Sequence, residues 1–463
     1  MGSLTALLSL SNSALSADQK ALSITSENVA NQNTAGYTRQ VAVFTDDAVS
    51  LNGTSIGLQV EGVSQRDRVL EQRVQQQTQT SSSTQARLTA LSAIDAAFGL
   101  TSTSSDASST ELGSAINSFY SSLAALSSSP TDSTTRGSVL AAASSLAAAF
   151  NDASSSIQSQ SATLNAQITT AAGQINGLTS EVASLNLQIT ALDPNQDAGA
   201  LEDQRQEAIE QLSQLVGVNQ ITNESNGVTL TASDGTVLVS GGTSQSIGTT
   251  TVDGNTELTA GTPPVTISGI TGGSIGGMMQ ARDQDLPPML AQLDSLAYDI
   301  GTAVNTQNEA GVTASGTAGT AIFSLPSTSA GAAADLSVSM SDGSQLATAG
   351  TGEGVNGTTN ALALAALGTA HLASGDTASN TFAAFIGQIG NTVSAATTAN
   401  TAASTALTQA TTQRDSLSAV SLDEEASSLT QYQRSYEAAA KVFSVINDLM
   451  ASAINLGTES TVT

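Results

Sequence analysis

The sequence contains no cysteine, and His371 is its only histidine. Without cysteine there can be no disulfide, no thiolate nucleophile and no thiolate metal ligand. A single histidine cannot supply a multi-histidine metal site or a catalytic set based on histidine pairs. The glycine-rich segment 272–277 has neither the following lysine nor the spacing of a phosphate-binding loop. We therefore predict no catalytic residue, no metal site and no cofactor.

Positive charge is also scarce. Twelve Lys and Arg stand against 39 Asp and Glu, giving a formal net charge of -27, so no basic patch could attract nucleic acid or an anionic membrane. The longest apolar run, 361–367, is far shorter than the roughly 20 residues that cross a bilayer. The first 17 residues lack the basic region of a cleaved signal peptide. We predict no nucleic-acid binding, no membrane insertion and no cleaved signal peptide.

Aromatic residues make up only 3% of the chain, and large apolar residues recur at regular intervals among Ser, Thr, Ala, Gln and Asn. Such a composition suits long helices that meet along narrow seams better than a thick core. The predicted fold class is mainly α with a β-rich part, in an elongated multidomain protein.

The first helix is predicted over residues 4–29, where apolar residues follow the 3.5-residue repeat of a coiled coil. Its stripe contains Leu4, Leu8, Leu15 and Leu22. Asn28, Asn31 and Gly36 follow, and Asn and Gly tolerate the left-handed conformation that ends helices. Alternating residues from 41 to 60 predict two short strands around a turn at Asn52 and Gly53.

The middle of the chain changes its period twice. Residues 66–215 keep helical spacing, with breaks at the Ser/Thr run 100–110 and at Pro130 and Pro194. Residues 216–270 alternate around the turn Asp234-Gly235, and 311–376 are rich in Gly, Ala and Ser with weak strand signals. We predict a helical domain of 37–215, 272–310 and 378–419. The predicted outer β-rich domain consists of 216–271 and 311–377, and residues 311–376 are expected to be its most exposed part.

The end of the chain has the strongest pattern, because 382–417 and 422–450 both repeat as heptads. The stripe of the last helix contains Leu422, Leu429, Tyr432, Tyr436, Phe443, Ile446 and Met450. Ser421 and Glu424 form a capping box, and Asp423 and Glu424 lie at the positive end of the helix dipole. A helix with one apolar stripe is marginal alone, so segments 1–36 and 420–463 should pair with each other or with neighbouring molecules.

Five segments, one of them 60–66 (VEGVSQR), carry a family resemblance. Residues 27–40, ENVANQNTAGYTRQ, resemble the signature after the first helix of flagellar rod, hook and hook-associated proteins. The motif turn within it contains Asn28, Asn31, Gly36, Tyr37 and Arg39. Segments 201–205 (LEDQR), 272–287 and 420–425 (VSLDEE) are similar to the hook-associated protein 1 family more specifically. Residues 311–376 depart from the family pattern, because they look short beside its larger outer domains.

The resemblance implies a structural subunit of the bacterial flagellum whose terminal helices form an inner tube around the export channel. The implied assembly is a homo-oligomeric ring at the hook-filament junction. It would contact the hook protein, the second hook-associated protein and, through that protein, flagellin. The resemblance also implies export by the flagellar type III apparatus to an extracellular location, with a cytoplasmic chaperone on the C-terminal helix.

Other interpretations remain open at this point. Flagellin and the second junction protein are also axial proteins with terminal coiled coils. A flagellum-exported enzyme would need a cleft with convergent acid and base groups, and no segment offers one. An adhesin could use the Ser- and Thr-rich outer region 311–376. For Gly36 and Tyr37, a plain helix cap and a plain core residue are at least as expected as subunit contacts.

Overall fold

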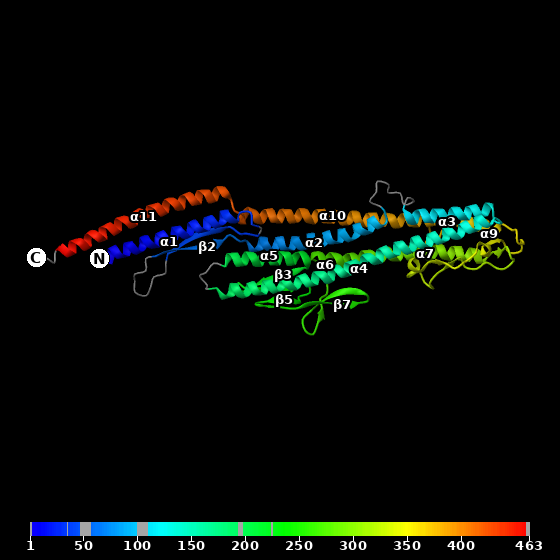
Figure 1. Ribbon diagram of the computed structural model, residues 1–463, viewed down its shortest axis with the longest axis horizontal. Helices are drawn as coiled ribbons and strands as arrows, with labels where there is room; N and C mark the ends of the chain where they lie inside the picture. The colour runs from blue at the N-terminus through cyan, green and yellow to red at the C-terminus, as the bar shows by residue number, and fades with distance from the viewer. Residues whose placement is uncertain are drawn as a thin grey trace.

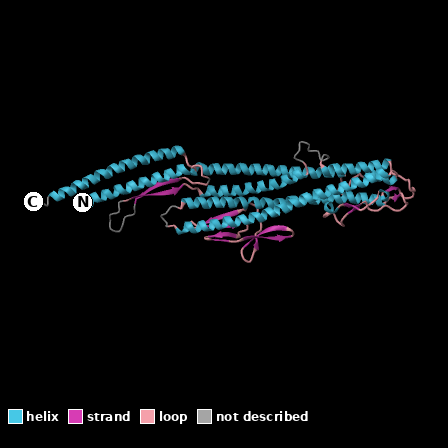
Figure 2. Cartoon of the chain, viewed as in Figure 1, coloured by secondary structure: helices cyan, strands magenta, loops and turns pink. Residues whose placement is uncertain are grey.

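The computed structural model describes residues 2–34, 36–46, 57–99, 110–192, 198–223 and 226–459. The molecule is elongated, and its long helices run side by side along the long axis (Figures 1 and 2). Both ends of the chain lie at the same end of the molecule (Figure 1). The predicted fold class, mainly α with a separate strand-rich part, is confirmed.

The terminal part of the molecule contains two antiparallel helices and a hairpin. Helix α1 (Gly2–Asn31) packs along α11 (Leu422–Glu459). Strands β1 (Gln40–Asp46) and β2 (Leu58–Ser64) are antiparallel, and both contact α1. The predicted strands are therefore present, while their predicted turn at Asn52 and Gly53 lies outside the described residues.

The body is a bundle of helices around one apolar core. Its long helices are α2 (Arg68–Ala97), α4 (Ser133–Ala191), α7 (Leu286–Glu309) and α10 (Ala378–Ser418). The shorter ones are α3 (Glu111–Ser128), α5 (Gly199–Leu215) and α6 (Gly273–Gln280), and a π-helical turn (Ala281–Asp285) joins α6 to α7. At 1.5 Å per residue the 59 residues of α4 extend about 90 Å. Pro130 separates α3 from α4, as the sequence predicted.

Two small antiparallel sheets lie beside α4. One has the order β3 (Val218–Thr222), β4 (Val228–Ala232), β5 (Val237–Ser240) and β6 (Thr243–Ser244). The other has the order β7 (Ile247–Val252), β8 (Asn255–Ala260) and β9 (Val265–Thr266). The predicted turn at Asp234-Gly235 joins β4 to β5, and Gly235 has the positive φ of 88° that such a turn requires.

Asparagine side chains attach these sheets to α4. Asn186 donates to the carbonyl oxygens of Val228 and Gly241 and accepts from the Val228 amide. Asn176 and Asn165, at intervals of about three helical turns, bind the backbone at Ile247 and at Gly254 and Thr256 in the same way. Each amide acts like a short piece of backbone, so loops are held without a charged partner.

Residues 311–377 do not form one β domain with 216–271, and here the predicted outer domain needs correction. Their strands β10 (Val312–Thr313), β11 (Phe323–Ser324), β12 (Ser337–Val338) and β13 (Ala347–Ala349) make separate two-stranded sheets. Together with the short helices α8 (Ala332–Asp335) and α9 (Thr359–Ala366), they lie at the far end of the body from the termini (Figure 1).

The same segment is less exposed than its composition suggested. Ile322, Phe323, Leu336 and Leu346 join the apolar core of the body. Asn305 of α7 holds the backbone of Ile322 and Phe323, and Asn308 holds that of Thr320 and Ala347. The weak strand signals correspond to four short paired strands, and side chains of α7 add hydrogen bonds to their backbone.

Candidate functional site

The seam between α1 and α11 contains most of the predicted stripe residues, but few are fully buried. Leu4, Leu8, Leu15 and Leu22 are half-buried on α1. On α11, Ile446 is buried, whereas Leu429, Tyr432, Tyr436, Phe443 and Met450 are half-buried. Leu422 is 49% exposed, so within this chain it is not part of the seam.

Two aromatic side chains of α11 mark the contacts of the seam. The Tyr436 hydroxyl accepts a hydrogen bond from Gln19 of α1 at 3.4 Å. The Tyr432 ring lies 5.9 Å from the ring of Phe44 in β1, measured between ring centroids. The hairpin therefore extends the surface on which α11 packs.

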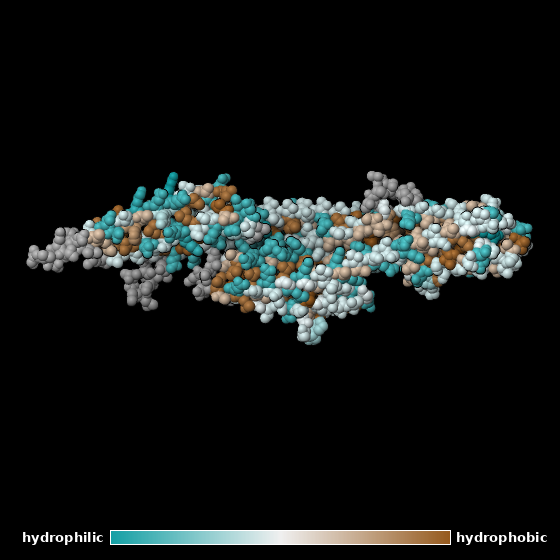
Figure 3. Space-filling view, in the orientation of Figure 1, coloured by the Kyte–Doolittle hydropathy of each residue, from teal (hydrophilic) through white to brown (hydrophobic). Residues whose placement is uncertain are grey.

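A second apolar stripe on α11 faces away from this seam. Val442, Val445 and Leu449 are more than half exposed and lie on one face of the helix, at the spacing i, i+3 and i+7. On α1, Leu7 and Leu10 are also exposed. Hydrophobic and hydrophilic residues are mixed over the terminal helices, whereas the surface beside α10 is largely pale (Figure 3). The predicted site residues did not include Val445 or Leu449, although their helical spacing was a readable signal.

Asn28 is the centre of the motif turn and is almost fully buried. Its Nδ2 donates to the Gln40 carbonyl at 2.8 Å and to Glu425 Oε2 at 3.1 Å. Its Oδ1 accepts from the Tyr37 hydroxyl at 2.9 Å and from the Gln40 amide at 3.0 Å. All the bonding capacity of this amide is used, and it connects α1, β1 and α11.

Arg39 connects the motif turn to the first turn of α11. Its Nε donates to Glu425 Oε1 at 2.8 Å, and its Nη1 pairs with Glu424 Oε2. Its backbone amide binds the carbonyl of Ser418 at 2.9 Å, at the end of α10. Glu424 therefore has an arginine partner in addition to its place at the helix start. Glu425 is only 2% exposed. It lies in the resemblance segment 420–425 but was not among the predicted site residues.

The remaining predicted residues lie around these contacts. Asn31 is the last residue of α1, and its Nδ2 donates to the Glu27 carbonyl at 3.0 Å. Gly36 has a positive φ of 77°, and a Cβ there would lie 3.2 Å from Glu207 of α5. Ser421 directly precedes α11, its carbonyl accepts from the Glu425 amide, and Asp423 is exposed in the first turn.

The motif turn is bound to the body through Asp203 of α5. Thr38 donates to this carboxylate from its backbone amide at 3.1 Å and from its hydroxyl at 2.8 Å. Arg66, just before α2, pairs with the same carboxylate and also donates to the Glu202 carbonyl at 3.2 Å. Segments 27–40, 201–205 and 420–425, which carry the family resemblance, therefore meet at one place.

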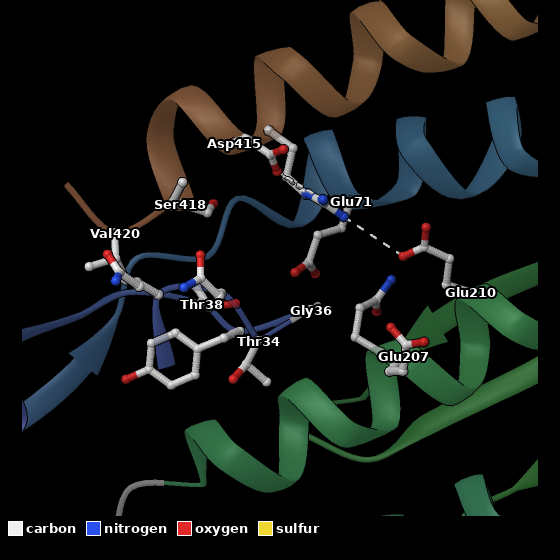
Figure 4. A pocket seen from close by; sticks show the side chains of 15 residues that line it. Thr34, Gly36, Thr38, Glu71, Glu207, Glu210, Asp415, Ser418 and Val420 are labelled. Atoms are coloured by element: carbon white, nitrogen blue, oxygen red, sulfur yellow. Dashed lines mark hydrogen bonds and ion pairs between the residues drawn. The ribbon is translucent and has the colours of Figure 1, made fainter. Parts of the chain in front are cut away.

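A cavity of about 290 Å³ lies beneath the motif turn. The carboxylates of Glu71, Glu207, Glu210 and Asp415 surround it, and Arg414 pairs with Glu210 at 3.7 Å (Figure 4). Burial raises the pKa of Glu71 to about 7, and it also raises the pKa values of Asp203 and Glu210. The described lining of this cavity therefore contains four carboxylates and one arginine.

The fourth resemblance segment, 272–287, lies elsewhere. It leads from β9 into α6, and Gly277 packs so closely on α2 that a Cβ would lie 1.9 Å from the Ser83 carbonyl oxygen. This glycine allows close helix packing. No helix in the described ranges is both long and apolar enough to cross a membrane. Within the same ranges, no three His, Cys, Asp or Glu side chains are grouped as metal ligands would be.

Family models match three parts of the chain. Residues 99–323 match the helical domain of the flagellar hook-associated protein FlgK. Residues 413–456 match the C-terminal region of the flagellar basal body rod proteins FlgEFG, and residues 8–38 match the flagella basal body rod protein. Both ends and the middle of the chain thus match families of flagellar rod and hook-associated proteins.

Individual relatives narrow this class. The chain is 32% identical to flagellar hook-associated protein 1 of Bacillus subtilis over 96% of both chains. It is 27% identical to flagellar hook-associated protein 1 of Escherichia coli, over 70% of this chain and 60% of that protein. The flagellar hook junction protein FlgK of Burkholderia pseudomallei has the same fold, with a TM-score of 0.68 at 19% identity, over 76% of this chain and all of the other. The chain belongs to the flagellar hook-associated protein 1 family.

Proposed function

We propose that this chain is a structural subunit of the flagellum at the junction of hook and filament, and that it has no enzymatic activity. The observation that carries the proposal is the 32% identity to flagellar hook-associated protein 1 over 96% of both chains. That similarity includes both terminal helices as well as the body. It favours this function over flagellin, an adhesin or a flagellum-exported enzyme.

Assembly in this proposal uses the stripe that a single copy leaves exposed. Val442, Val445 and Leu449 of α11 and Leu7 and Leu10 of α1 would be covered by the terminal helices of neighbouring copies in a ring. Full burial of one such side chain contributes about 1.5–3 kcal/mol. Several such contacts per copy would bring the terminal helices together as an inner tube, while the bodies project outward.

The proposed partners are the hook protein on one side and the second hook-associated protein on the other, with flagellin beyond it. Before export, the apolar stripe of α11 would need cover in the cytoplasm, which a chaperone bound to this helix would provide. Export by the type III apparatus without a cleaved signal peptide would then place the protein outside the cell.

The test is a strain that lacks this chain, compared with the same strain carrying the wild-type sequence. We expect complete hooks without filaments, and flagellin released into the medium, with both defects reversed by the wild-type sequence. Normal filaments on the deletion strain would overturn the proposal. Loss of hooks as well as filaments would move the function to an earlier step than the junction.

A further inference from the structure

One arginine of the body, Arg205 in α5, is buried without a counter-ion. It is 5% exposed, and its two hydrogen bonds both come from Nη1, to Asn186 Oδ1 at 3.0 Å and to the Asn226 carbonyl at 2.7 Å. Among the described residues, Nε and Nη2 have no partner and no carboxylate forms an ion pair with Arg205. Burial lowers the pKa of Arg205 to about 10. A buried charge in this condition is costly unless something else neutralises it.

Arg205 lines a cavity of about 200 Å³ together with Arg66 and Arg68, between the start of α2, α5 and the turn that leads into β4. Arg68 is exposed and donates from Nη2 to Asn226 Oδ1 at 3.0 Å. The Arg66 side chain is 9% exposed, and its Nε has no hydrogen-bond partner. Three of the twelve basic side chains of this acidic protein therefore converge on one small space.

Two carboxylates also line this cavity, and they favour the charged form of Arg205 from a distance without forming an ion pair with it. Glu202 accepts a hydrogen bond from Asn226 Nδ2, and its other oxygen lies 4.0 Å from Arg66 Nη1. Glu71 lies 3.4 Å from Arg66 Nε, and burial raises its pKa to about 7, so it carries only part of a charge at neutral pH. The remaining lining includes neutral donors from Gln72, Gln206 and Thr222. Three arginines therefore face Glu71, Glu202 and, through Arg66, Asp203, and the unpaired Nε and Nη2 of Arg205 are the donors that the cavity offers to a ligand.

We propose that this cavity binds an oxyanion, whose oxygens accept from the free Nε and Nη2 of Arg205 and from Arg68. Guanidinium groups bind carboxylate, sulfate and phosphate through paired hydrogen bonds, which are stronger than hydrogen bonds between neutral groups. The bound anion connects α2, α5 and the β4 turn beside the Arg66–Asp203 contact, where the terminal helices join the body. The oxyanion comes either from the medium or from an Asp or Glu side chain of a second copy.

Binding is tested on the purified full-length chain with inorganic phosphate, by the broadening of the phosphate ³¹P signal and by thermal unfolding in sulfate against chloride at equal ionic strength. We expect sulfate to raise the unfolding temperature more than chloride does. Arg68→Gln and Arg205→Lys should each increase the dissociation constant for phosphate about tenfold or more. Arg73→Gln is the matched control, because Arg73 lies on the same helix outside the cavity and binds Gln413.

Equal effects of sulfate and chloride on the wild type, or equal losses in Arg73→Gln and Arg68→Gln, would overturn the proposal. Glu224 lies outside the described residues, so Glu224→Gln is included. If phosphate binds only to this variant, the anion is the chain's own carboxylate and the proposed ligand is wrong. The two sources are separated by sedimentation. If phosphate dissociates oligomers, the anion comes from a second copy, and if binding leaves the oligomeric state unchanged, it comes from the medium.

Discussion

The body and the terminal helices of this molecule bury their apolar side chains differently. The body encloses Phe119, Phe150 and Leu146 completely within one chain, and its loops are held by neutral asparagine side chains as well as by Arg136 and Asp294. The terminal helices leave an apolar stripe exposed and meet the body through arginines and carboxylates. The core of the body is complete within one chain, whereas the terminal helices leave apolar side chains in water that the proposed assembly would cover.

The two regions also differ in how many charged side chains they carry. Residues 378–413 of α10 contain no charged side chain. Threonines along this helix, such as Thr397, Thr401 and Thr405, return their hydroxyl hydrogen bonds to the carbonyl four residues earlier. Charge is instead concentrated around the motif turn. Ion pairs respond to pH and salt more than neutral hydrogen bonds do. We therefore expect the contacts around the motif turn to change with pH and salt more than those along α10.

The largest expected effect is on assembly. Val445→Asp places a carboxylate in the exposed stripe of α11, and a carboxylate cannot be buried unpaired in an apolar contact. We expect normal secretion and a stable monomer, but no filaments, as counted by electron microscopy. Asn447→Asp is the control, because Asn447 is exposed on another face of the same helix. Normal filaments on the Val445→Asp strain would show that assembly does not need the exposed apolar stripe of α11.

Truncation of one apolar side chain should lower the free energy of unfolding much more in the body than in the terminal helices. Phe150→Ala leaves a cavity in the core of the body and should lower the free energy of unfolding by about 3–5 kcal/mol. Leu449→Ala removes a side chain that is mostly in water and should change it by less than about 0.5 kcal/mol. Urea unfolding followed by circular dichroism measures both. Similar losses would mean that Leu449 is already covered in the monomer.

Removal of the buried carboxylate at the junction should loosen α11 alone. Glu425→Ala removes the acceptor of Arg39 Nε and one of the two acceptors of Asn28 Nδ2, at a cost of roughly 1–3 kcal/mol. Hydrogen exchange should become faster over 422–440 and stay unchanged in α4. Asp423→Asn, an exposed position two residues earlier, should have little effect. Faster exchange throughout the body would show that the junction stabilises the whole molecule.

The smallest expected effect is the pH dependence that Glu71 gives to the body. Its folded pKa of about 7 lies above the ordinary glutamate value of 4.5, so the folded state binds more protons between these values. Its contribution therefore destabilises the protein as pH rises from about 4.5 to 7, by on the order of 3 kcal/mol. Glu71→Gln should remove this loss, so its unfolding free energy should change less than that of the wild type between pH 5 and pH 8.

Glu111→Gln is the control for this measurement, because Glu111 also lies in the first turn of a helix but is exposed. It should keep the pH dependence of the wild type. If Glu71→Gln keeps it as well, the pH response comes from Asp203 or Glu210, whose pKa values are also raised by burial.

Local pattern was enough to predict the helices at both ends of the chain, the break at Pro130 and the turn at Asp234-Gly235. These features depend on residues within a few positions of one another. The sequence also supplied the motif segments and, through them, the family.

Contacts between distant segments needed the tertiary structure. Asn28 contacts Glu425, which lies 397 residues further along the chain, and Thr38 contacts Asp203, which lies 165 residues further along. No sequence spacing predicts either contact. Residues 311–377 form the short strands that their sequence signals, but only the structure shows that Asn305 and Asn308 of α7 hold this backbone. The sequence by itself thus determined which helices form, because helix formation depends on neighbouring residues. Only the packing of those helices against one another determined which charged side chains meet and that Arg205 is buried beside a cavity.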